Sequence, residues 1–181
     1  MSKEFAARRL DVKVFAEDGA TLRGQQALSG YPRLFAETHG EGAASQVSWS
    51  ARGELRNPLH LHPEIWLHLH AQATLPLTCQ RCLAPVAQPV TVDRSFRFVT
   101  GEEIAASQDE GSEEDVLALT RSLDLLELVE DELLMDLPLA PRHESCPQPV
   151  NMSVADPDFD GASAQRENPF ALLGKLKDDK S

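Results

Sequence analysis

The sequence predicts an α+β fold that is rich in β-structure. Three long segments between residues 47 and 98 alternate apolar and polar residues, which is the period of a strand with one buried face. An amphipathic helical pattern follows at residues 124–137. We therefore expect an antiparallel meander of long strands packed with one main helix, plus an acidic disordered loop and a flexible C-terminal tail ending in a short helix.

Composition divides the chain into three parts. Residues 1–46 are expected to be a partly ordered N-terminal segment, and residues 47–146 contain the meander and the helix. Residues 147–181 are polar and Pro-rich, which predicts a flexible tail. Near its end, Asn168 and Pro169 have the residue types that begin a helix, so we expect a short helix there.

The N-terminal segment has weaker patterns. Arg8–Phe15 alternates loosely and is interpreted as a strand. Tyr31–Thr38 is interpreted as a short helix, because Pro32 suits a first helical position. Residues 39–45 are rich in Gly, Ala and Ser and predict a loop.

The meander strands are expected at residues 47–56, 65–78 and 90–98. In the third strand Arg94 interrupts the apolar face. The sequence Cys-Gln-Arg-Cys at residues 79–82 lies between the second and third strands. It is therefore expected at the tip of a hairpin.

The chain after the meander is strongly acidic. Residues 102–115 contain seven acidic residues among fourteen, which predicts a solvated, mobile loop. Asp124 and Glu127 then form a capping box, which predicts the start of a helix that ends at Pro138. Its expected apolar stripe consists of Leu125, Leu126, Val129, Leu133, Leu134 and Leu137.

Charge and cysteine content restrict the class of protein. The net charge is −12 and the isoelectric point about 4.8, which disfavours a protein that wraps nucleic acid and suits a basic partner such as a small ribosomal protein. Three cysteines argue against a secreted disulfide framework, and residues 1–10 contain no apolar h-region or cleavage signal, so we expect no secretion. With no segment of membrane-spanning length, the expectation is a bacterial cytoplasmic protein without membrane association.

Two pairs of residues have the spacing of metal ligands. Cys79 and Cys82 form a C-x-x-C pair, and His143 and Cys146 form an H-x-x-C pair soon after the predicted helix. Thiolate and imidazole together suit Zn²⁺, which takes four ligands in structural sites. We interpret these four residues as a possible structural zinc site that joins the hairpin tip to the chain beyond the helix.

Other interpretations stay open at this stage. The cysteines can be unliganded residues of a hairpin tip, or a redox dithiol, although redox C-x-x-C motifs normally begin a helix. Four further histidines are interpreted as solvated strand or loop residues: His60, His62, His68 and His70. No nucleophile elbow, Walker loop or dinucleotide-binding motif is present. Arg81 and Arg94 form at most a small anion-binding patch.

Several segments, taken in order, resemble the YceD family of large ribosomal RNA subunit accumulation proteins. The first is CQRCLAP. The second is residues 124–146, which include LVEDELLMDLPLAPRH and end at Cys146. The third is NPFALLGKLK, near the end of the chain. The resemblance runs from about residue 47 to 177. It implies a role in 23S rRNA synthesis, processing or stability, and hence in assembly of the large ribosomal subunit.

From this resemblance and from the charge, we expect a non-enzymatic binding protein whose partner is a pre-50S particle or a basic ribosomal protein. Contact with 23S rRNA is expected to be indirect, or local to Arg81. The expected partner-binding residues are Arg81, Glu127, Glu130, Asp131 and Glu132. The alternatives are a zinc-dependent RNA-processing enzyme, which needs an open coordination position, and a thiol redox protein, which needs a cysteine of depressed pKa.

Overall fold

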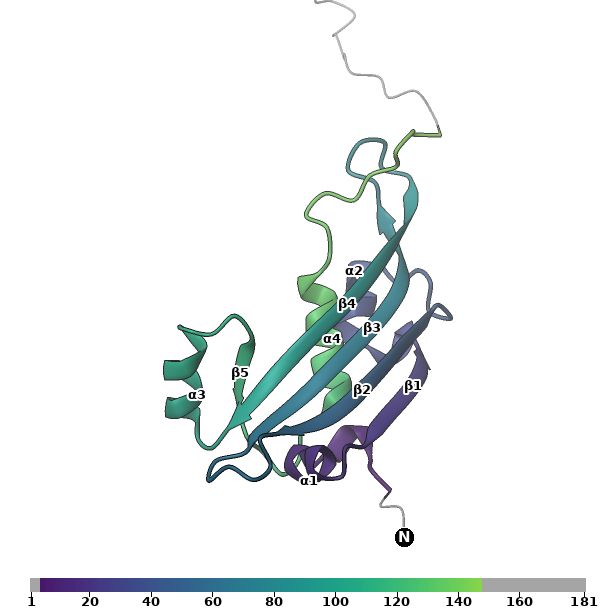
Figure 1. Cartoon of the computed structure of the whole chain (residues 1–181). Helices are drawn as coiled ribbons and strands as arrows, with labels where there is room; N and C mark the ends of the chain where they lie inside the picture. Colours follow the sequence, from purple (N-terminus) through teal and green to yellow (C-terminus); the bar gives the residue numbers. More distant parts are fainter. Residues whose placement is uncertain (1–3, 148–181) are drawn as a thin grey trace, which may run out of the picture. The chain divides into compact units, whose positions relative to one another are not determined.

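A five-stranded sheet organises residues 4–147, the part of the chain that the computed structural model describes (Figure 1). The strands lie in sequence order: β1 Thr21–Ala27, β2 Gln46–Arg56, β3 Glu64–Thr78, β4 Pro85–Val99 and β5 Asp115–Ala118. Neighbours from β1 to β4 are antiparallel, and β5 pairs in parallel with β4. The α+β class and the antiparallel meander β2–β3–β4 are confirmed.

One face of the meander is buried, as the alternation predicts. In register, Trp49 of β2 pairs with Ala71 of β3, and Leu67 pairs with Phe96 of β4. All four side chains are buried in a single hydrophobic core. The opposite face is mostly polar, and its Trp66 is buried beneath the guanidinium of Arg56, 4.0 Å from the ring centroid.

Three helices cover the buried face: α1 Val12–Glu17, α2 Pro32–Glu37 and α4 Leu125–Met135. Helix α1 lies so close to β2 that a Cβ on Gly53 would be 2.6 Å from the carbonyl oxygen of Phe15. This close approach explains why a glycine occupies a buried strand position. Helix α4 begins at the predicted cap, where Asp124 accepts hydrogen bonds from the backbone N–H groups of Leu126 and Glu127.

The N-terminal prediction was partly wrong. Arg8–Phe15 is not a strand: it overlaps the short 3₁₀ helix Ala7–Arg9 and contains most of α1, whose N-terminus is capped by the side chain of Asp11. The strand of this segment is β1, which the sequence analysis missed. Its inward residues include Gly24 and Gln26, so it has no apolar alternation, and pairing with β2 defines it. The short helix α2, with Pro32 at its start, is confirmed.

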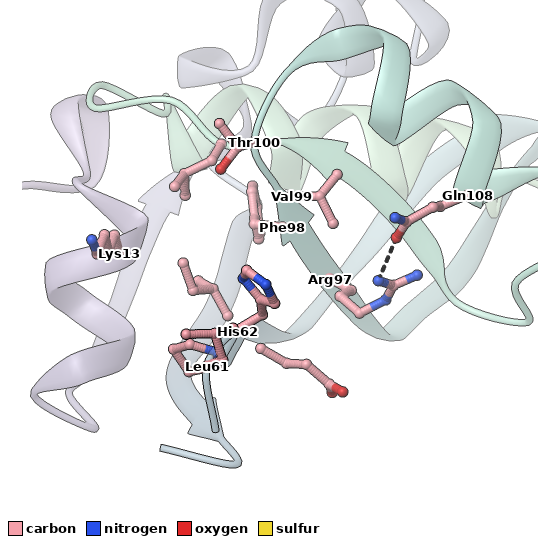
Figure 2. Close-up of a pocket in the computed structure, with 12 residues that line it drawn as sticks. Lys13, Leu61, His62, Arg97, Phe98, Val99, Thr100 and Gln108 are labelled. Atoms are coloured by element: carbon pink, nitrogen blue, oxygen red, sulfur yellow. Dashed lines mark hydrogen bonds between the residues drawn. The ribbon is translucent and has the colours of Figure 1, made fainter. Parts of the chain in front are cut away.

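The acidic segment is ordered rather than a mobile loop. It contains helix α3, Glu102–Asp109, and leads into β5. The side chain of Arg97 donates hydrogen bonds to Gln108 (2.8 Å, Figure 2) and Ser112 (3.1 Å). Asp109 accepts one from the backbone N–H of Val116 (2.8 Å). Acidic composition alone predicts solvation, but these contacts with the end of β4 hold the segment in place.

The described residues up to Cys146 form one compact unit. The N-terminal segment packs within this unit together with the meander. The predicted tail and its short helix from Asn168 lie outside the described residues. Within residues 4–147, no helix has the length and apolar character needed to cross a membrane.

Candidate metal centre

The connection between β3 and β4, residues 79–84, is a tight turn that we call the tip. Its ends are joined by two backbone hydrogen bonds, from Cys79 N to Ala84 O and from Leu83 N to Cys79 O, both 2.9 Å. Leu83 adopts φ +60°, the left-handed conformation that a tight turn imposes. The tip thus holds Cys79 and Cys82 on one short, closed loop, as the sequence predicts.

The chain beyond α4 reaches this tip. After Pro138 it runs along the end of the sheet to the β3–β4 turn (Figure 1). The backbone N–H of Gln80 donates to the carbonyl oxygen of Pro141 at 2.8 Å. A second hydrogen bond joins His143 Nε2 to the carbonyl oxygen of Pro85 at 3.0 Å. These contacts bring the H-x-x-C pair beside the C-x-x-C pair.

The four predicted ligands converge into one group, the Cys/His cluster (Cys79, Cys82, His143 and Cys146). Their ligand atoms all lie within 4.8 Å of one another. Cys82 Sγ and His143 Nδ1 are 3.5 Å apart. In a tetrahedral zinc site with bonds of ~2.3 Å to sulfur and ~2.0 Å to nitrogen, such a pair would be about 3.5 Å apart. The donor set and this spacing fit a Zn²⁺ ion.

The orientation of His143 also fits metal binding. A carbonyl oxygen can only accept a hydrogen bond, so Nε2 of His143 carries the proton that it donates to Pro85. In the neutral ring Nδ1 then has a free lone pair, and this nitrogen lies next to Cys82. Fixing the tautomer of a ligating histidine through its other nitrogen is the usual arrangement around protein metal sites.

The electrostatics of the cluster favour a thiolate at Cys79. Burial on its own would raise the pKa of this thiol. The backbone N–H groups of Cys82, His143 and Arg81 outweigh that effect, together with the side chain of Cys82, and the pKa falls to about 5. Burial and the neighbouring cysteines raise the pKa of Cys146 instead. Backbone N–H groups aimed at one sulfur stabilise its negative charge, which a zinc ligand also carries.

The cluster has a closed set of donors. Four protein side chains would complete the tetrahedral coordination of zinc, leaving no position for a substrate or a water molecule. A depressed cysteine pKa is also what a redox thiol requires. However, the thiol with the low pKa belongs to Cys79, whose exposed fraction is 0%, so its sulfur is shielded from exchange partners. The geometry fits a structural metal site best.

Comparison with known proteins identifies the family. The model of the YceD family, described as "Large ribosomal RNA subunit accumulation protein YceD", matches residues 67–177. The chain belongs to the YceD family. A relative of that name from Haemophilus influenzae is 32% identical over 109 residues, which are 59% of this chain. The match covers only 62% of that relative's length. No solved structure matches the chain.

The match to the YceD family includes β4, the tip, α4 and both pairs of the Cys/His cluster. It excludes α1, β1, α2 and β2, which lie before residue 67. The candidate metal centre therefore lies entirely within the region shared with the family.

The structure separates the acidic residues of α4 that were predicted to bind a partner. Glu127 is exposed, and Asp131 forms an ion pair with Arg33 at the protein surface. Glu130 and Glu132 are buried, so the expectation that they face a partner was wrong. Arg81 is exposed at the tip, as its predicted role requires.

Glu130 has an internal structural role. Its carboxylate accepts hydrogen bonds from the backbone N–H groups of Arg33 (2.7 Å) and Leu34 (3.1 Å) at the start of α2. Two further bonds come from the guanidinium of Arg33. The sequence contained a sign of this role, because Glu130 lies between Leu126 and Leu133 on the apolar stripe. An acid there must find partners inside the fold.

Glu132 explains why Arg94 interrupts an apolar strand face. Arg94 points from β4 towards α4, where its Nε lies 3.6 Å from a carboxylate oxygen of Glu132. Burial raises the pKa of Glu132, and Asp115 adds to this increase, while Arg94 opposes it. The pair joins the helix to the sheet. Arg94 therefore does not belong to a patch with Arg81, and its predicted anion-binding role is not supported by this geometry.

The remaining histidines do not gather into a site. His68 is held by Glu54 (2.6 Å) and Ser95 (2.8 Å), and His60 accepts a hydrogen bond from the backbone of His62 (3.3 Å). Within residues 4–147, the Cys/His cluster is the one group of three or more potential ligands close enough to hold a metal.

Proposed function

We propose that this protein is a non-enzymatic cytoplasmic factor in assembly of the large ribosomal subunit, required for the synthesis, processing or stability of 23S rRNA. The single observation that carries the proposal is the match of the YceD family to residues 67–177. The relative from Haemophilus influenzae bears a name referring to accumulation of the large-subunit RNA. The shared region contains the tip, α4 and the Cys/His cluster, so we assign the function to this end of the protein.

We further propose that the Cys/His cluster holds a structural Zn²⁺ ion. Three sulfur donors and the unprotonated nitrogen of His143 form a set that zinc prefers. The ion would join the tip to the chain after α4, where His143 is separated from Cys82 by 61 positions in the sequence. Closing so long a loop restricts the unfolded chain and stabilises the folded one.

The proposed partner is a pre-50S particle, which this protein would bind through a basic ribosomal protein. A net charge of −12 favours basic proteins and repels RNA phosphates. Any contact with 23S rRNA would be indirect or confined to exposed Arg81. Attraction between oppositely charged surfaces is screened by salt. We therefore expect added salt to weaken co-sedimentation with pre-50S particles.

Depletion in the bacterium of origin tests the ribosomal role. We expect a deficit of 23S rRNA and large subunits with normal small subunits, reversed by the wild-type gene. Normal subunit profiles after complete depletion would remove the proposal. The alternative of an RNA-processing enzyme is tested with zinc-loaded protein and precursor 23S rRNA, which should remain intact. Zinc-dependent cleavage would establish the enzyme instead.

Elemental analysis of native protein tests the metal. We expect about one zinc per chain, and none in a Cys79→Ser, Cys82→Ser double variant. A wild-type protein without metal, in which Cys79 forms disulfides with glutathione at neutral pH, would support the thiol redox alternative.

A further inference from the structure

A groove lies beside the Cys/His cluster and has no part in metal binding. Its volume is about 390 Å³, and it is bounded by the end of β3, the C-terminal ends of α2 and α4, and the segment Pro138–Pro141. Seven of its eleven lining residues are apolar, among them Leu77, Leu134, Leu137, Pro138 and Pro141. A hollow of this kind can take apolar side chains from another molecule.

Exposed apolar residues stand at the edge of this groove. The side chains of Met135 and Leu139 also line it, and these residues are 77% and 105% exposed. Met135 ends α4, and Leu139 lies one residue after the proline that stops the helix. Two large apolar residues left in water next to an apolar hollow are typical of a binding surface.

The charges around the groove select a cationic partner. Glu37 and His39 line it, and among residues 4–147 the lining contains no Lys or Arg. Helix α4 ends there with exposed Asp136 as its C-cap and no basic residue in its last turn. The C-terminus of a helix carries partial negative charge, which a Lys or Arg normally offsets. Helix α4 supplies no such residue in its own last turn.

We propose that this groove binds an amphipathic segment of a basic protein. Its apolar side chains would fill the hollow against Leu134, Leu137 and Leu139, and its Lys or Arg side chains would meet Glu37, Asp136 and the end of α4. This inference rests on the proposed function and narrows it, by naming the surface that receives the basic partner. RNA is disfavoured, because its phosphates would face the same negative charges.

The hydrogen bond from Gln80 to Pro141 connects the groove to the metal centre. One wall of the groove is the segment Pro138–Pro141, which runs directly into His143. A metal ion held by the Cys/His cluster would fix this wall in place. Removing the metal is therefore expected to weaken binding in the groove as well.

The test uses full-length protein and a labelled synthetic helix with leucines on one face and lysines on the other, followed by fluorescence anisotropy. We expect Leu139→Asp to weaken binding by at least about tenfold, since anchor residues dominate such interfaces. Leu59→Asp is the matched control, because Leu59 is also fully exposed (102%) but lies in the β2–β3 connection. We expect it to bind as the wild type does.

The two variants add the same negative charge, so non-specific attraction would strengthen lysine-peptide binding in both. Weaker binding in Leu139→Asp alone supports the groove. Equal binding by wild type and both variants would overturn it, as would equal binding of a peptide with glutamates in place of lysines. Both variants should retain their thermal transition, because neither leucine is buried.

A photo-crosslinking residue at position 139 or 59 in living cells distinguishes partner classes. We expect a protease-sensitive product with a basic protein from position 139 only. A nuclease-sensitive RNA product at position 139 would overturn the proposal. The ribosomal role is judged separately, by the depletion experiment. If depletion removes large subunits while Leu139→Asp binds the peptide normally, the groove proposal fails and the proposed function stands.

Discussion

The two loops at either end of β3 each contain two potential metal ligands but have different surroundings (Figure 1). The β3–β4 tip contains Cys79 and Cys82, and the β2–β3 connection, residues 57–63, contains His60 and His62. Both loops also expose leucines to water, Leu83 in the first and Leu59 in the second. Each therefore offers two potential ligands at short spacing on an exposed turn.

The difference lies in what approaches each loop. The segment after α4 brings two further ligands to the tip. Within residues 4–147, no further ligand comes close to the histidines of the β2–β3 connection, which share a local hydrogen bond. Short spacing along one turn supplies at most half of a tetrahedral site. The other half must come from a distant segment, held nearby by contacts that do not involve the metal. At the tip, the bonds from Gln80 to Pro141 and from His143 to Pro85 provide those contacts.

The largest expected effect is at the tip. Cys79→Ser removes a buried sulfur donor and should abolish zinc binding. It should lower the melting temperature by more than about 10 °C, because a structural metal contributes directly to folding. Elemental analysis and calorimetry measure these effects. Retained zinc with an unchanged melting temperature would show that the Cys/His cluster is not a structural metal site.

A second variant tests whether a loss of folding stability is enough to cause loss of the metal. Glu130→Gln should destabilise the fold by about 2 kcal/mol, since it weakens the bonds to the start of α2 and to Arg33. Zinc content should remain at the wild-type level, because Glu130 does not belong to the cluster. Denaturant unfolding and elemental analysis provide the two measurements. As a control on the same helix, Glu127→Gln should change stability by less than about 0.5 kcal/mol.

The pH dependence of metal-free protein tests the electrostatics of the tip. The folded-state pKa of Cys79 is about 5, well below the ordinary value for a thiol. The unfolded chain therefore binds more protons between pH 5 and pH 9, and the Cys79 contribution to stability rises with pH over that range. It is lost as the pH falls through about 5. The pKa of Cys146 is raised, so this thiol makes stability fall with increasing pH, but only at pH values above the ordinary pKa of a thiol.

Unfolding of chelator-treated wild type and Cys79→Ser at several pH values isolates this contribution. We expect the difference in stability between the two proteins to grow from pH 5 to pH 8. Absorbance at 240 nm should show thiolate in the folded wild type already at pH 7. A difference that does not change with pH would mean that Cys79 titrates like an ordinary thiol.

The smallest effect is expected in the β2–β3 connection. The double variant His60→Ala, His62→Ala removes two exposed side chains whose hydrogen bond is local. Zinc content should not change, and the melting temperature should stay within about 2 °C of the wild type. A loss of zinc comparable with that of Cys79→Ser would make the two loops equivalent and refute the distinction between them.

The elements best predicted from sequence were those with a strong local pattern. Residues 65–77 alternate over the full length of β3, and Asp124 caps α4 where the sequence places the cap. Strand β1 has no such pattern. It lies at the edge of the sheet, and its backbone pairing with β2, rather than an alternation of its own residues, makes it a strand. Helix α3 was hidden by its acidic composition, since the contacts that hold it come from Arg97 on β4.

The sequence by itself determined the residue types and spacings: three long amphipathic strands, one capped helix, and two ligand pairs that use every cysteine. Only the tertiary structure decided that the two pairs meet, that His143 presents Nδ1, and that Glu130 and Glu132 face inward. The physical reason is that hydrophobic periodicity is a local property of the chain. Metal coordination, a histidine tautomer and a buried carboxylate depend on atoms from segments far apart in sequence.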